Sequence, residues 1–382
     1  MKYALILTTA LVFTACSPSA DSTPTSETVK SASEAKPTVK IIRAKTEHVA
    51  KSDPYTLTWE TIPADRPVRI EVSSDPEAKL GAGELVTEDA QGSFTWITEE
   101  PLKRHYFTLI PESGDPVKTA VRLLPLEGGR NFRDIGGYKT KDGKSVKWGQ
   151  VFRSGTMVGL TDTDYDYLSS AGIAVICDFR SESERKNEPT NWQAPNGEYV
   201  TFPDAVGEMG MMSGFMEILK GPDPSPEKIS KVMADSYPDM AKQYAPHYTE
   251  VFDRLAGGDI PLAFNCSAGK DRAGTSAALI LTALGVPKET VVEDYALSEA
   301  YVDYMEEFSA ENYEKIPDDH PYAFLKKIPK EMLVPLMRSD PKYIKKTLET
   351  LEMEYGSIEG FLKEEVGVTD AELQTIRSEL LE

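Results

Sequence analysis

Hydrophobic and polar residues follow a different pattern in each of two long regions of the chain. In the first, residues 38–125, apolar and polar positions alternate, and turn-forming residues separate the runs. Because successive side chains of a strand point to opposite faces, this period of two predicts short β-strands, and their spacing predicts a small β-sandwich. The positions expected to share inward faces are Tyr55, Leu57 and Trp59; Val68, Ile70 and Val72; Phe94 and Trp96; and Tyr106, Thr108 and Ile110.

In the second region, residues 126–382, short apolar runs alternate with longer helical patterns. This alternation predicts an α/β domain in which helices flank a central, mostly parallel sheet. Amphipathic stretches near the C-terminus are expected to pack as scaffold helices. The expected strands are 151–152, 173–177, 199–202 and 261–264, and the expected C-terminal helices are 287–308 and 341–381.

Candidate chemistry is concentrated just after the apolar run 261–264. Cys266 precedes Arg272 by six positions, Gly269 lies between them, and an Ala/Leu/Ile-rich stretch follows at 277–284. This order predicts a strand, a tight loop and a helix. The N–H groups of such a loop and of the helix N-terminus form an anion-binding cup that also favours a thiolate. The pattern therefore predicts a cysteine phosphatase rather than a buried, inert cysteine.

Each residue of this loop has an expected role. Cys266 is the nucleophile, Arg272 grips two phosphate oxygens with its planar guanidinium, and the Thr275 hydroxyl assists the later departure of the thiolate. Lys270 adds positive charge at the rim, where it either contacts a second phosphate or is solvated. The residues expected to bind phosphate are Ser267, Ala268, Gly269, Lys270, Asp271 and Arg272.

The segment from Cys266 to Gly274 resembles the signature loop of the protein-tyrosine phosphatase superfamily, in the form found in bacterial tyrosine and phosphoinositide phosphatases. The resemblance implies that family's fold and a phosphorylated protein or phosphoinositide as substrate. One departure is Asn265, where the family usually has histidine; an amide carries no charge, so the thiolate is expected to be less favoured. Other matching segments are 129–138, 151–155, 178–184, 294–295 and 355–357, and the resemblance covers 126–382.

Two aspartates compete for the role of general acid. Asp271 lies inside the loop, at the place where the resembling family is proposed to carry its acid, although it could instead pair with Lys270 or Arg272. Asp204 follows a proline at a strand end, like the acid of eukaryotic relatives, although a turn role explains it equally well. We favour Asp271 because it lies next to the scissile group.

Residues outside the loop are expected to support it. If the four strands run parallel, their carboxyl ends bring Cys266, Arg153, Asp178 and Asp204 together. Arg153 then either lines the pocket or pairs with Asp178 or Glu184, and Asn265 lies beside the nucleophile. These three, Asn265, Arg153 and Asp178, are the expected supporting residues.

A methionine-rich insert lies between Asp204 and Asp259, interrupted by glycines. Methionine often fills gaps in a core, so a core helix is one interpretation. The family resemblance implies the other, a mobile lid over the pocket, and the glycines near its ends favour movement.

The N-terminus has the pattern of an export signal. Lys2 precedes an apolar run, 3–15, that is too short to remain as a membrane span. Small residues before Cys16 resemble a lipoprotein cleavage site, with ordinary signal cleavage as the alternative. The expected divisions are a lipoprotein-type signal peptide (1–16), a flexible Ser/Thr/Pro-rich tether (17–37), the β-sandwich (38–125) and the catalytic domain (126–382).

Charge and composition limit the classes of molecule that the protein is expected to bind. A net charge of −20 argues against nucleic acid and against broad binding to anionic membranes, which leaves a lipid at Cys16 as the expected membrane attachment. Three cysteines and four scattered histidines give no metal-ligand spacing, and no cofactor is expected. Cys177 is expected to be a core residue, with a disulfide to Cys266 as the alternative.

Three functions therefore remain. The first is an exported, lipid-anchored phosphatase on the periplasmic or cell-surface side of a bacterial membrane. Its expected substrate is phosphotyrosine, with phosphoserine, phosphothreonine and phosphoinositides as secondary candidates. The second is a low-activity or inactive module that binds phosphorylated ligands, for which Asn265 is the argument. The third is a surface protein in which the β-sandwich carries the function.

Overall fold

The computed structural model describes residues 38–192, 197–205, 209–304 and 323–382. The expected signal peptide and tether, 1–37, lie outside these residues, as do positions 305–308 of one expected helix. Within the described residues, no helix combines the length and the apolar character that crossing a membrane would need.

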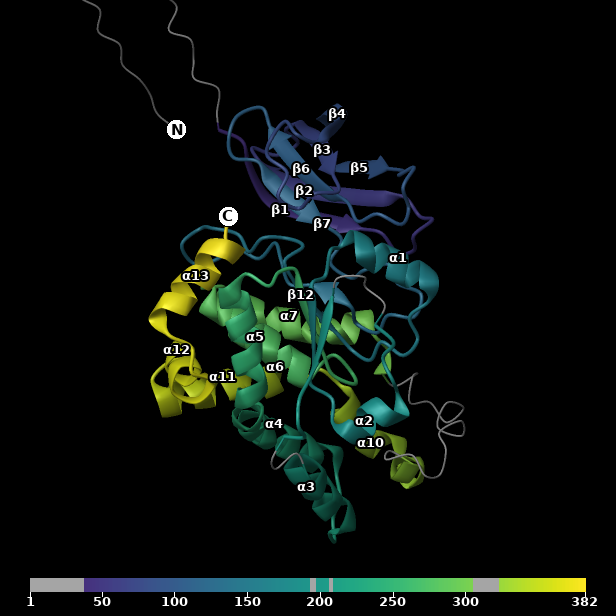
Figure 1. The fold of residues 1–382 in the computed structure, drawn as a ribbon, viewed down its shortest axis with the longest axis vertical. Coiled ribbons are helices and arrows are strands. Elements are labelled where there is room, and N and C mark those ends of the chain that lie inside the picture. The colour runs from purple at the N-terminus through teal and green to yellow at the C-terminus, as the bar shows by residue number, and fades with distance from the viewer. Residues whose placement is uncertain (1–37, 193–196, 206–208, 305–322) are drawn as a thin grey trace, which may run out of the picture. The chain divides into compact units, whose positions relative to one another are not determined.

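Two antiparallel sheets make up the first region, as the alternating pattern predicts (Figure 1). Their inward faces form one core that includes Tyr55, Leu57 and Trp59 from one sheet and Val68 and Ile70 from the other. The first sheet has the order β1 (Lys40–Glu47), β2 (Tyr55–Ile62), β5 (Ser93–Trp96), and the second β4 (Glu84–Ala90), β3 (Val68–Ser73), β6 (Tyr106–Pro111), β7 (Val117–Ala120).

One predicted strand face is wrong. The inward residues of β6 are Phe107 and Leu109, not Tyr106 and its alternate neighbours. Tyr106 packs on the opposite face, in a small cluster with Ala120 and Trp148. Because β6 is covered on both sides, its apolar residues do not alternate cleanly, and the pattern alone misplaces the inward face.

The second region contains the predicted, mostly parallel sheet. Four strands run parallel in the order β11 (Glu198–Thr201), β10 (Val175–Asp178), β12 (Leu262–Asn265), β9 (Val151–Ser154), and the short β8 (Arg133–Asp134) pairs antiparallel with β9. All four predicted strands are therefore confirmed, and their carboxyl ends lie at one edge.

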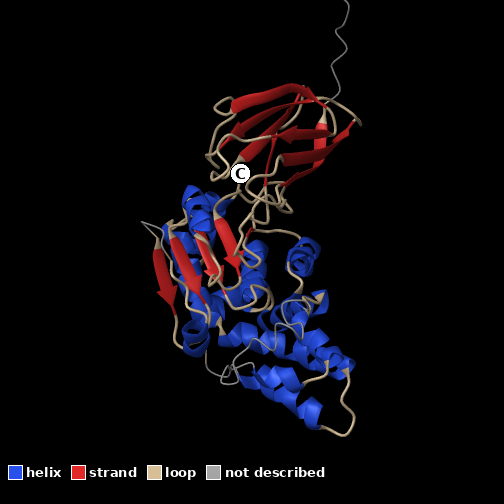
Figure 2. Ribbon diagram, turned by 90° about the vertical axis from the view of Figure 1, so that its right-hand side faces the viewer, coloured by secondary structure: helices blue, strands red, loops and turns tan. Residues whose placement is uncertain are grey.

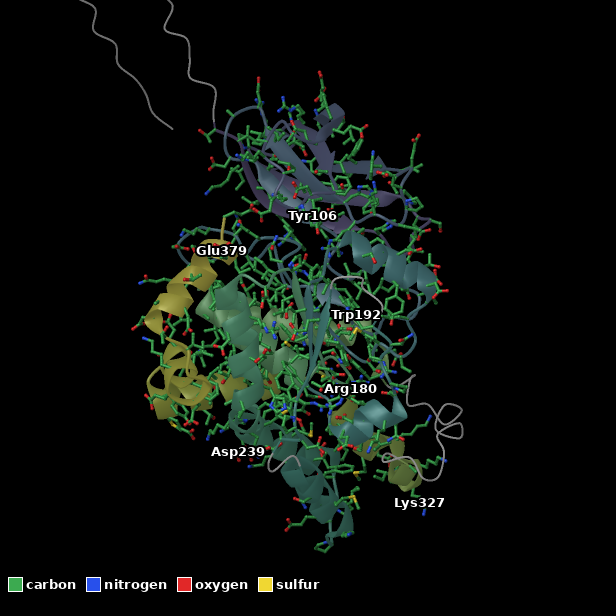
Figure 3. All side chains as sticks on the ribbon, in the orientation of Figure 1. Tyr106, Arg180, Trp192, Asp239, Lys327 and Glu379 are labelled. Atoms are coloured by element: carbon green, nitrogen blue, oxygen red, sulfur yellow. The ribbon has the colours of Figure 1, made fainter. Side chains whose placement is uncertain are left out.

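Helices cover both faces of this sheet (Figure 2). On one face, α1 contributes Tyr167 and Leu168 to a small core with Phe152 and Ile176. On the other face, most of the remaining helices share one large core with the opposite side chains of the strands. Figure 3 shows the side chains that lie between these helices and strands. The helices preceding residue 284 are α1 (Asp162–Ser170), α2 (Glu182–Asn187), α3 (Met209–Lys220), α4 (Pro226–Gln243), α5 (Ala245–Gly257) and α6 (Arg272–Ala283).

The C-terminal part is helical, as predicted, and packs on the same large core. The insert after Asp204 is mostly core: α4 buries Met233 and Tyr237, and α5 buries Tyr248 and Leu255. In α3, Phe215 is also buried in this core, and Met216, Ile218 and Leu219 pack against it. The core interpretation therefore holds for these residues, and a lid movement of α3 stays a prediction. The C-terminal helices are α7 (Lys288–Tyr301), η1 (Ala323–Lys327), α10 (Lys330–Met337), α11 (Pro341–Tyr355), α12 (Ile358–Phe361), η2 (Leu362–Val366) and α13 (Asp370–Leu380).

Buried ion pairs connect the two-sheet region to the α/β region. The Arg104 guanidinium lies 2.6 Å from the Asp134 carboxylate, with both side chains essentially buried. The Lys51 ammonium lies 2.6 Å from Asp164, whose carboxylate also accepts the backbone N–H groups of Glu127 and Gly128. Residues 38–382 form one compact unit.

Candidate active site

The predicted strand, loop and helix are all present. Strand β12 ends at Asn265, the loop begins with Cys266, and α6 begins at Arg272. Gly269 adopts a φ of +74°, and a Cβ there would lie 2.5 Å from the Gly155 nitrogen, so both its conformation and its surroundings require glycine. This glycine lets the loop curl tightly around the cysteine.

The amide groups of the loop are arranged to bind an anion. Cys266 is only 1% exposed, and its sulfur accepts a hydrogen bond of 3.2 Å from the N–H of Gly269. Within the described part of the chain, the N–H groups of the other loop residues donate to no protein acceptor. Such groups, next to a helix N-terminus, stabilise a thiolate and a phosphate. These other donors are Ser267, Ala268, Lys270 and Asp271.

Most carbonyl groups of the same loop accept hydrogen bonds from donors outside the cup, which turns them outward. The Ser267 carbonyl accepts from the Thr156 N–H at 2.9 Å, and the Ala268 carbonyl accepts from the Tyr304 hydroxyl at 2.9 Å. The Asp271 carbonyl accepts from the N–H of Thr275 at 2.8 Å. A peptide whose C=O is fixed outward has its N–H facing inward, so these bonds hold the cup open.

A buried network fixes the middle of the loop. The Gly269 carbonyl accepts from Arg153 at 2.9 Å and from the Asn131 amide at 3.0 Å. Arg153 is in turn paired with Asp294 at 2.9 Å, and Arg133 donates to the Asp294 backbone carbonyl at 2.9 Å. The sequence blocks around 131–133 and 294 therefore act at the site by anchoring the loop.

Arg272 is held by a carboxylate that the sequence did not single out as its partner. Its two terminal nitrogens lie 2.8 and 2.7 Å from the two oxygens of Glu184, a bidentate pair. Glu184 also accepts from the Ser267 hydroxyl and from the Ser181 N–H. Burial alone would raise the pKa of Glu184, but attraction by Arg272 and these hydrogen bonds outweigh it and hold the pKa well below its usual range.

The two candidate acids have different surroundings. Asp271 accepts a hydrogen bond from the Tyr237 hydroxyl and lies 3.4 Å from the Lys270 ammonium, both at Oδ1. Burial and the Asp271 charge raise the pKa of Tyr237 well above its usual value, so the phenol keeps its proton and donates. Asp204 is exposed and accepts from the Glu182 N–H at 2.7 Å. Asp204 thus accepts at the N-terminus of α2, a structural role other than the turn that was expected as its alternative. Asp271 lies in the loop and contacts Lys270, which is the alternative pairing expected for it.

Two expected roles within the loop are corrected. Lys270 is not a rim residue: it is 3% exposed, and its ammonium donates to the backbone carbonyls of Leu336 and Arg338 at the end of α10. Thr275 donates its hydroxyl proton to the Asp271 carbonyl at 3.0 Å, so in this conformation it does not donate to the sulfur.

The supporting residues lie near the loop but pair differently from the prediction. Asn265 does not contact the sulfur; its amide donates at 3.0 Å to Asp178 on the neighbouring strand. Asp178 is paired with Arg180, at 2.8 Å, rather than with Arg153. Arg153 is fully buried, and its guanidinium donates to the carbonyls of Gly269 and Lys270 in the loop. All three therefore hold the strand ends and the loop rather than the substrate.

The two described cysteines are both free thiols. Cys177 lies opposite Phe264 in the sheet, two residues before Cys266. A strand spacing of about 4.8 Å and a two-residue offset of about 6.6 Å separate their Cα atoms by roughly 8 Å, beyond the about 7 Å that a disulfide spans. Burial raises the pKa of Cys177 to about 12, so it is an unreactive core residue.

Comparison with known proteins gives a consistent result. Residues 124–382 match the sequence profile of the Tyrosine phosphatase family. The chain is 27% identical over 285 residues to the "Triple specificity protein phosphatase PtpB" of Mycobacterium tuberculosis, covering 69% of this chain and 99% of that protein.

Two further relatives bear similar names. The chain is 26% identical over 244 residues to a Cupriavidus necator protein named "Putative tyrosine-protein phosphatase", covering 64% of this chain and 84% of that protein. It is 28% identical over 229 residues to the "Tyrosine-protein phosphatase" of Nostoc commune, covering 60% of this chain and 73% of that protein. Because the family profile spans most of the chain, including the cysteine loop and the network that anchors it, this protein belongs to the tyrosine phosphatase family.

Proposed function

We propose that this protein hydrolyses phosphotyrosine in two steps, with Cys266 as the nucleophile. The observation that carries the proposal is a buried sulfur, 1% exposed, inside a ring of backbone N–H groups that a bidentately held arginine closes. Family membership supports the same reaction.

In the first step, the Cys266 thiolate attacks phosphorus, forming the S–P bond as the bond to the leaving oxygen breaks. Arg272 and the loop N–H groups stabilise the charge on the three equatorial oxygens. Asp271 in its protonated form donates its proton to the leaving oxygen and becomes a carboxylate. In the second step, the Asp271 carboxylate takes a proton from the attacking water as the new P–O bond forms and the S–P bond breaks. Phosphate then leaves, the thiolate is restored and Asp271 is again protonated.

The depth of the nucleophile favours phosphotyrosine among the monoesters. A phosphate on a phenol ring projects farther from the peptide backbone than one on a serine hydroxyl, and Cys266 is almost fully covered. Two arguments favour phosphoinositides: the family resemblance, and a Lys270 that reaches a second phosphate. The second argument fails, because Lys270 is bound to the end of α10. Phosphoserine, phosphothreonine and phosphoinositides are therefore secondary substrates in this proposal.

The decisive experiment compares the wild type with Cys266→Ser. Hydrolysis of p-nitrophenyl phosphate and of a phosphotyrosine peptide is expected in the wild type, with inhibition by vanadate, and is expected to vanish in the variant. A panel of phosphoserine, phosphothreonine and inositol phosphates ranks the other monoesters. Phosphate binding by the wild type without turnover would support the alternative of a binding module instead.

We also propose that the protein is exported and anchored through a lipid on Cys16, facing the periplasm or the cell surface. The support is the sequence alone: Lys2, the short apolar run and the small residues before Cys16. Expression in a bacterium with radiolabelled palmitate is expected to label the wild type and not Cys16→Ala. Equal labelling, or wild-type protein that stays in the cytoplasm, would refute the anchor.

A further inference from the structure

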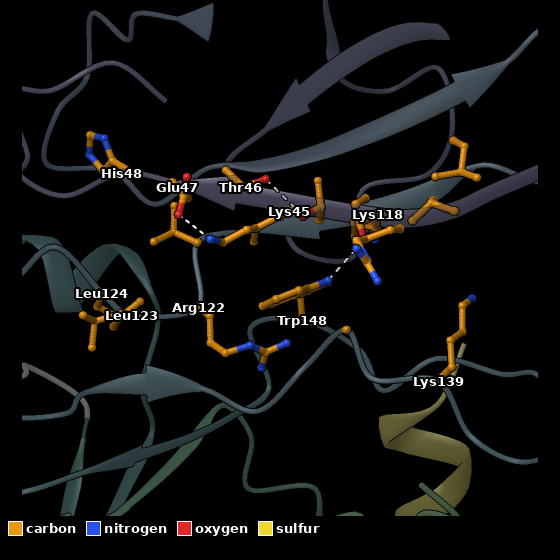
Figure 4. A pocket seen from close by; sticks show the side chains of 18 of the residues that line it. Lys45, Thr46, Glu47, His48, Lys118, Arg122, Leu123, Leu124, Lys139 and Trp148 are labelled. Carbon is orange, nitrogen blue, oxygen red and sulfur yellow. Dashed lines mark hydrogen bonds and ion pairs between the residues drawn. The ribbon is translucent and has the colours of Figure 1, made fainter. Parts of the chain in front are cut away.

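A cleft of about 540 Å³ lies outside the phosphatase site, between strands β1 and β7 and the segment that leads into the α/β region (Figure 4). We call it the β1–β7 cleft. Its volume is within the range of small-molecule sites, about 300–1,000 Å³. None of the residues that line it belongs to the Cys266 loop, so it is separate from the site described above.

The charge of the cleft is opposite to that of the whole protein. Its lining includes five lysines and arginines but one carboxylate, Glu47, in a chain whose net charge is −20. Figure 4 shows Lys45 and Lys118 on the strands and Arg122 and Lys139 across the cleft from them. A cationic hollow on an acidic protein attracts anions.

Two of these cations have no carboxylate within ion-pair distance among the described residues. Arg122 donates to the backbone carbonyls of Asp134 and Gly136, at 2.8 and 2.9 Å, and Lys139 donates to the Ser145 hydroxyl at 2.7 Å. Among the described residues, neither forms an ion pair with an acidic side chain. Because a guanidinium has five donors, Arg122 retains N–H groups for a ligand.

The surroundings of Arg122 are rigid. Its guanidinium lies 4.1 Å from the ring centre of Tyr138 and 4.8 Å from that of Trp148. Trp148 is 7% exposed and donates to the Lys118 carbonyl at 3.2 Å. A cation that is already fixed between aromatic rings loses little conformational entropy when it binds an anion.

The remaining wall is apolar. Ile41 and Ile42 of β1 and Val117 of β7 line the cleft, and Ile42 is 52% exposed. An inorganic anion would use the cations and leave these side chains in water. A ligand that carries an apolar body as well as a charge would cover both parts of the surface.

From this charge and shape we infer that the β1–β7 cleft binds an organic anion, a carboxylate, sulfonate or phosphate attached to an aromatic or acyl body. Its charged end lies against Arg122 and Lys139, and its apolar end lies against Ile42 and Val117. The inference does not depend on the phosphatase reaction.

The test uses 8-anilinonaphthalene-1-sulfonate, an aromatic sulfonate, titrated into the full chain and followed by its fluorescence. We expect one saturable site. Lys139→Ala and Arg122→Gln should each weaken binding by roughly tenfold, the value of one charge-assisted hydrogen bond. Lys139→Ala is the safer variant, because the lysine is exposed and Arg122 also supports the backbone. Lys141→Ala, an exposed lysine outside the cleft, is the matched control and should bind as the wild type.

Further measurements distinguish binding in the β1–β7 cleft from binding at the phosphatase loop or at a purely apolar surface. Cys266→Ser and added vanadate should leave binding unchanged, because the phosphatase loop is not involved. Sodium phosphate and the neutral N-phenyl-1-naphthylamine should each compete at least tenfold more weakly than unlabelled aromatic sulfonate. The inference is overturned if Lys139→Ala and Arg122→Gln bind as the wild type, if vanadate displaces the probe, or if either competitor matches the aromatic anion.

Discussion

Replacing Glu184 by glutamine tests whether one carboxylate positions the catalytic arginine. In the structure, both oxygens of Glu184 bind Arg272, at 2.7 and 2.8 Å, and the side chains are only 8% and 13% exposed. Removing one charge of a buried pair leaves the other uncompensated, which costs roughly 3–5 kcal/mol of unfolding free energy. Loss of a fixed donor to the transition state lowers kcat by about 10²–10³-fold.

The assay measures unfolding in urea and kcat/KM with p-nitrophenyl phosphate, on the same protein samples. Glu182→Gln is the matched control, because Glu182 lies on the same helix and forms an exposed pair with Lys186. Solvent screening leaves an exposed pair of this kind with little effect on stability. The control should therefore stay close to the wild type in both measurements.

The pH dependence supplies a second readout. The pKa of Glu184 is lowered in the folded protein, so its contribution to stability is complete above its unfolded value, 4.5, and is lost as the pH falls below that value. The stability difference between wild type and Glu184→Gln should thus be full at pH 7 and shrink below pH 4.5. If the variant unfolds like the wild type and keeps its kcat/KM, the positioning argument is wrong; if only stability falls, Glu184 supports the fold but does not position Arg272.

Three further predictions concern the same site. Asp271→Asn should slow hydrolysis of an alkyl phosphate far more than hydrolysis of p-nitrophenyl phosphate, because the p-nitrophenolate leaving group needs no acid. Asp204→Asn should not slow one of these substrates more than the other, and the reverse pattern would make Asp204 the acid. Tyr304→Phe leaves the Ala268 carbonyl without its hydroxyl donor, so stability should fall by about 1–3 kcal/mol and vanadate inhibition should weaken, as titration calorimetry and urea unfolding would show. Burial lowers the pKa of His247 to about 4, so stability should decrease as the pH falls from 6.5 towards 4, and His247→Gln should flatten that decrease in urea unfolding.

The strands, the loop and the nucleophile were predictable because they depend on local sequence. A run of apolar residues, a glycine that takes a positive φ and a cysteine six positions before an arginine are all visible within the segment 261–284. The inward face of strand β6 was harder to predict, because Tyr106 and Phe107 are both buried, on opposite faces of the strand. When both faces of a strand are covered, hydrophobicity no longer says which face points to the main core.

The partners of the loop were not predictable, because they come from distant segments. The Ser181–Glu184 spacing is that of a capping box and could have placed Glu184 at the start of a helix. Nothing in the local sequence places that helix beside Arg272. Lys270 is a charged residue in a glycine-rich loop, which favours a solvated rim, but α10, some sixty residues later, covers it and provides its acceptors.

The cup illustrates why the cysteine–arginine spacing alone is a weak signal. Inward N–H groups require outward carbonyls, and a buried carbonyl without a donor is costly. The donors here are Thr156, Tyr304, Arg153 and Asn131, which reach the loop from three other parts of the chain. A chance Cys-x5-Arg segment need not have such donors, and without them nothing holds its carbonyls outward and its N–H groups towards a phosphate. The specificity of the motif therefore resides in the surrounding network, and this is why the blocks around Asn131 and Asp294 belong to the active site as much as the loop does.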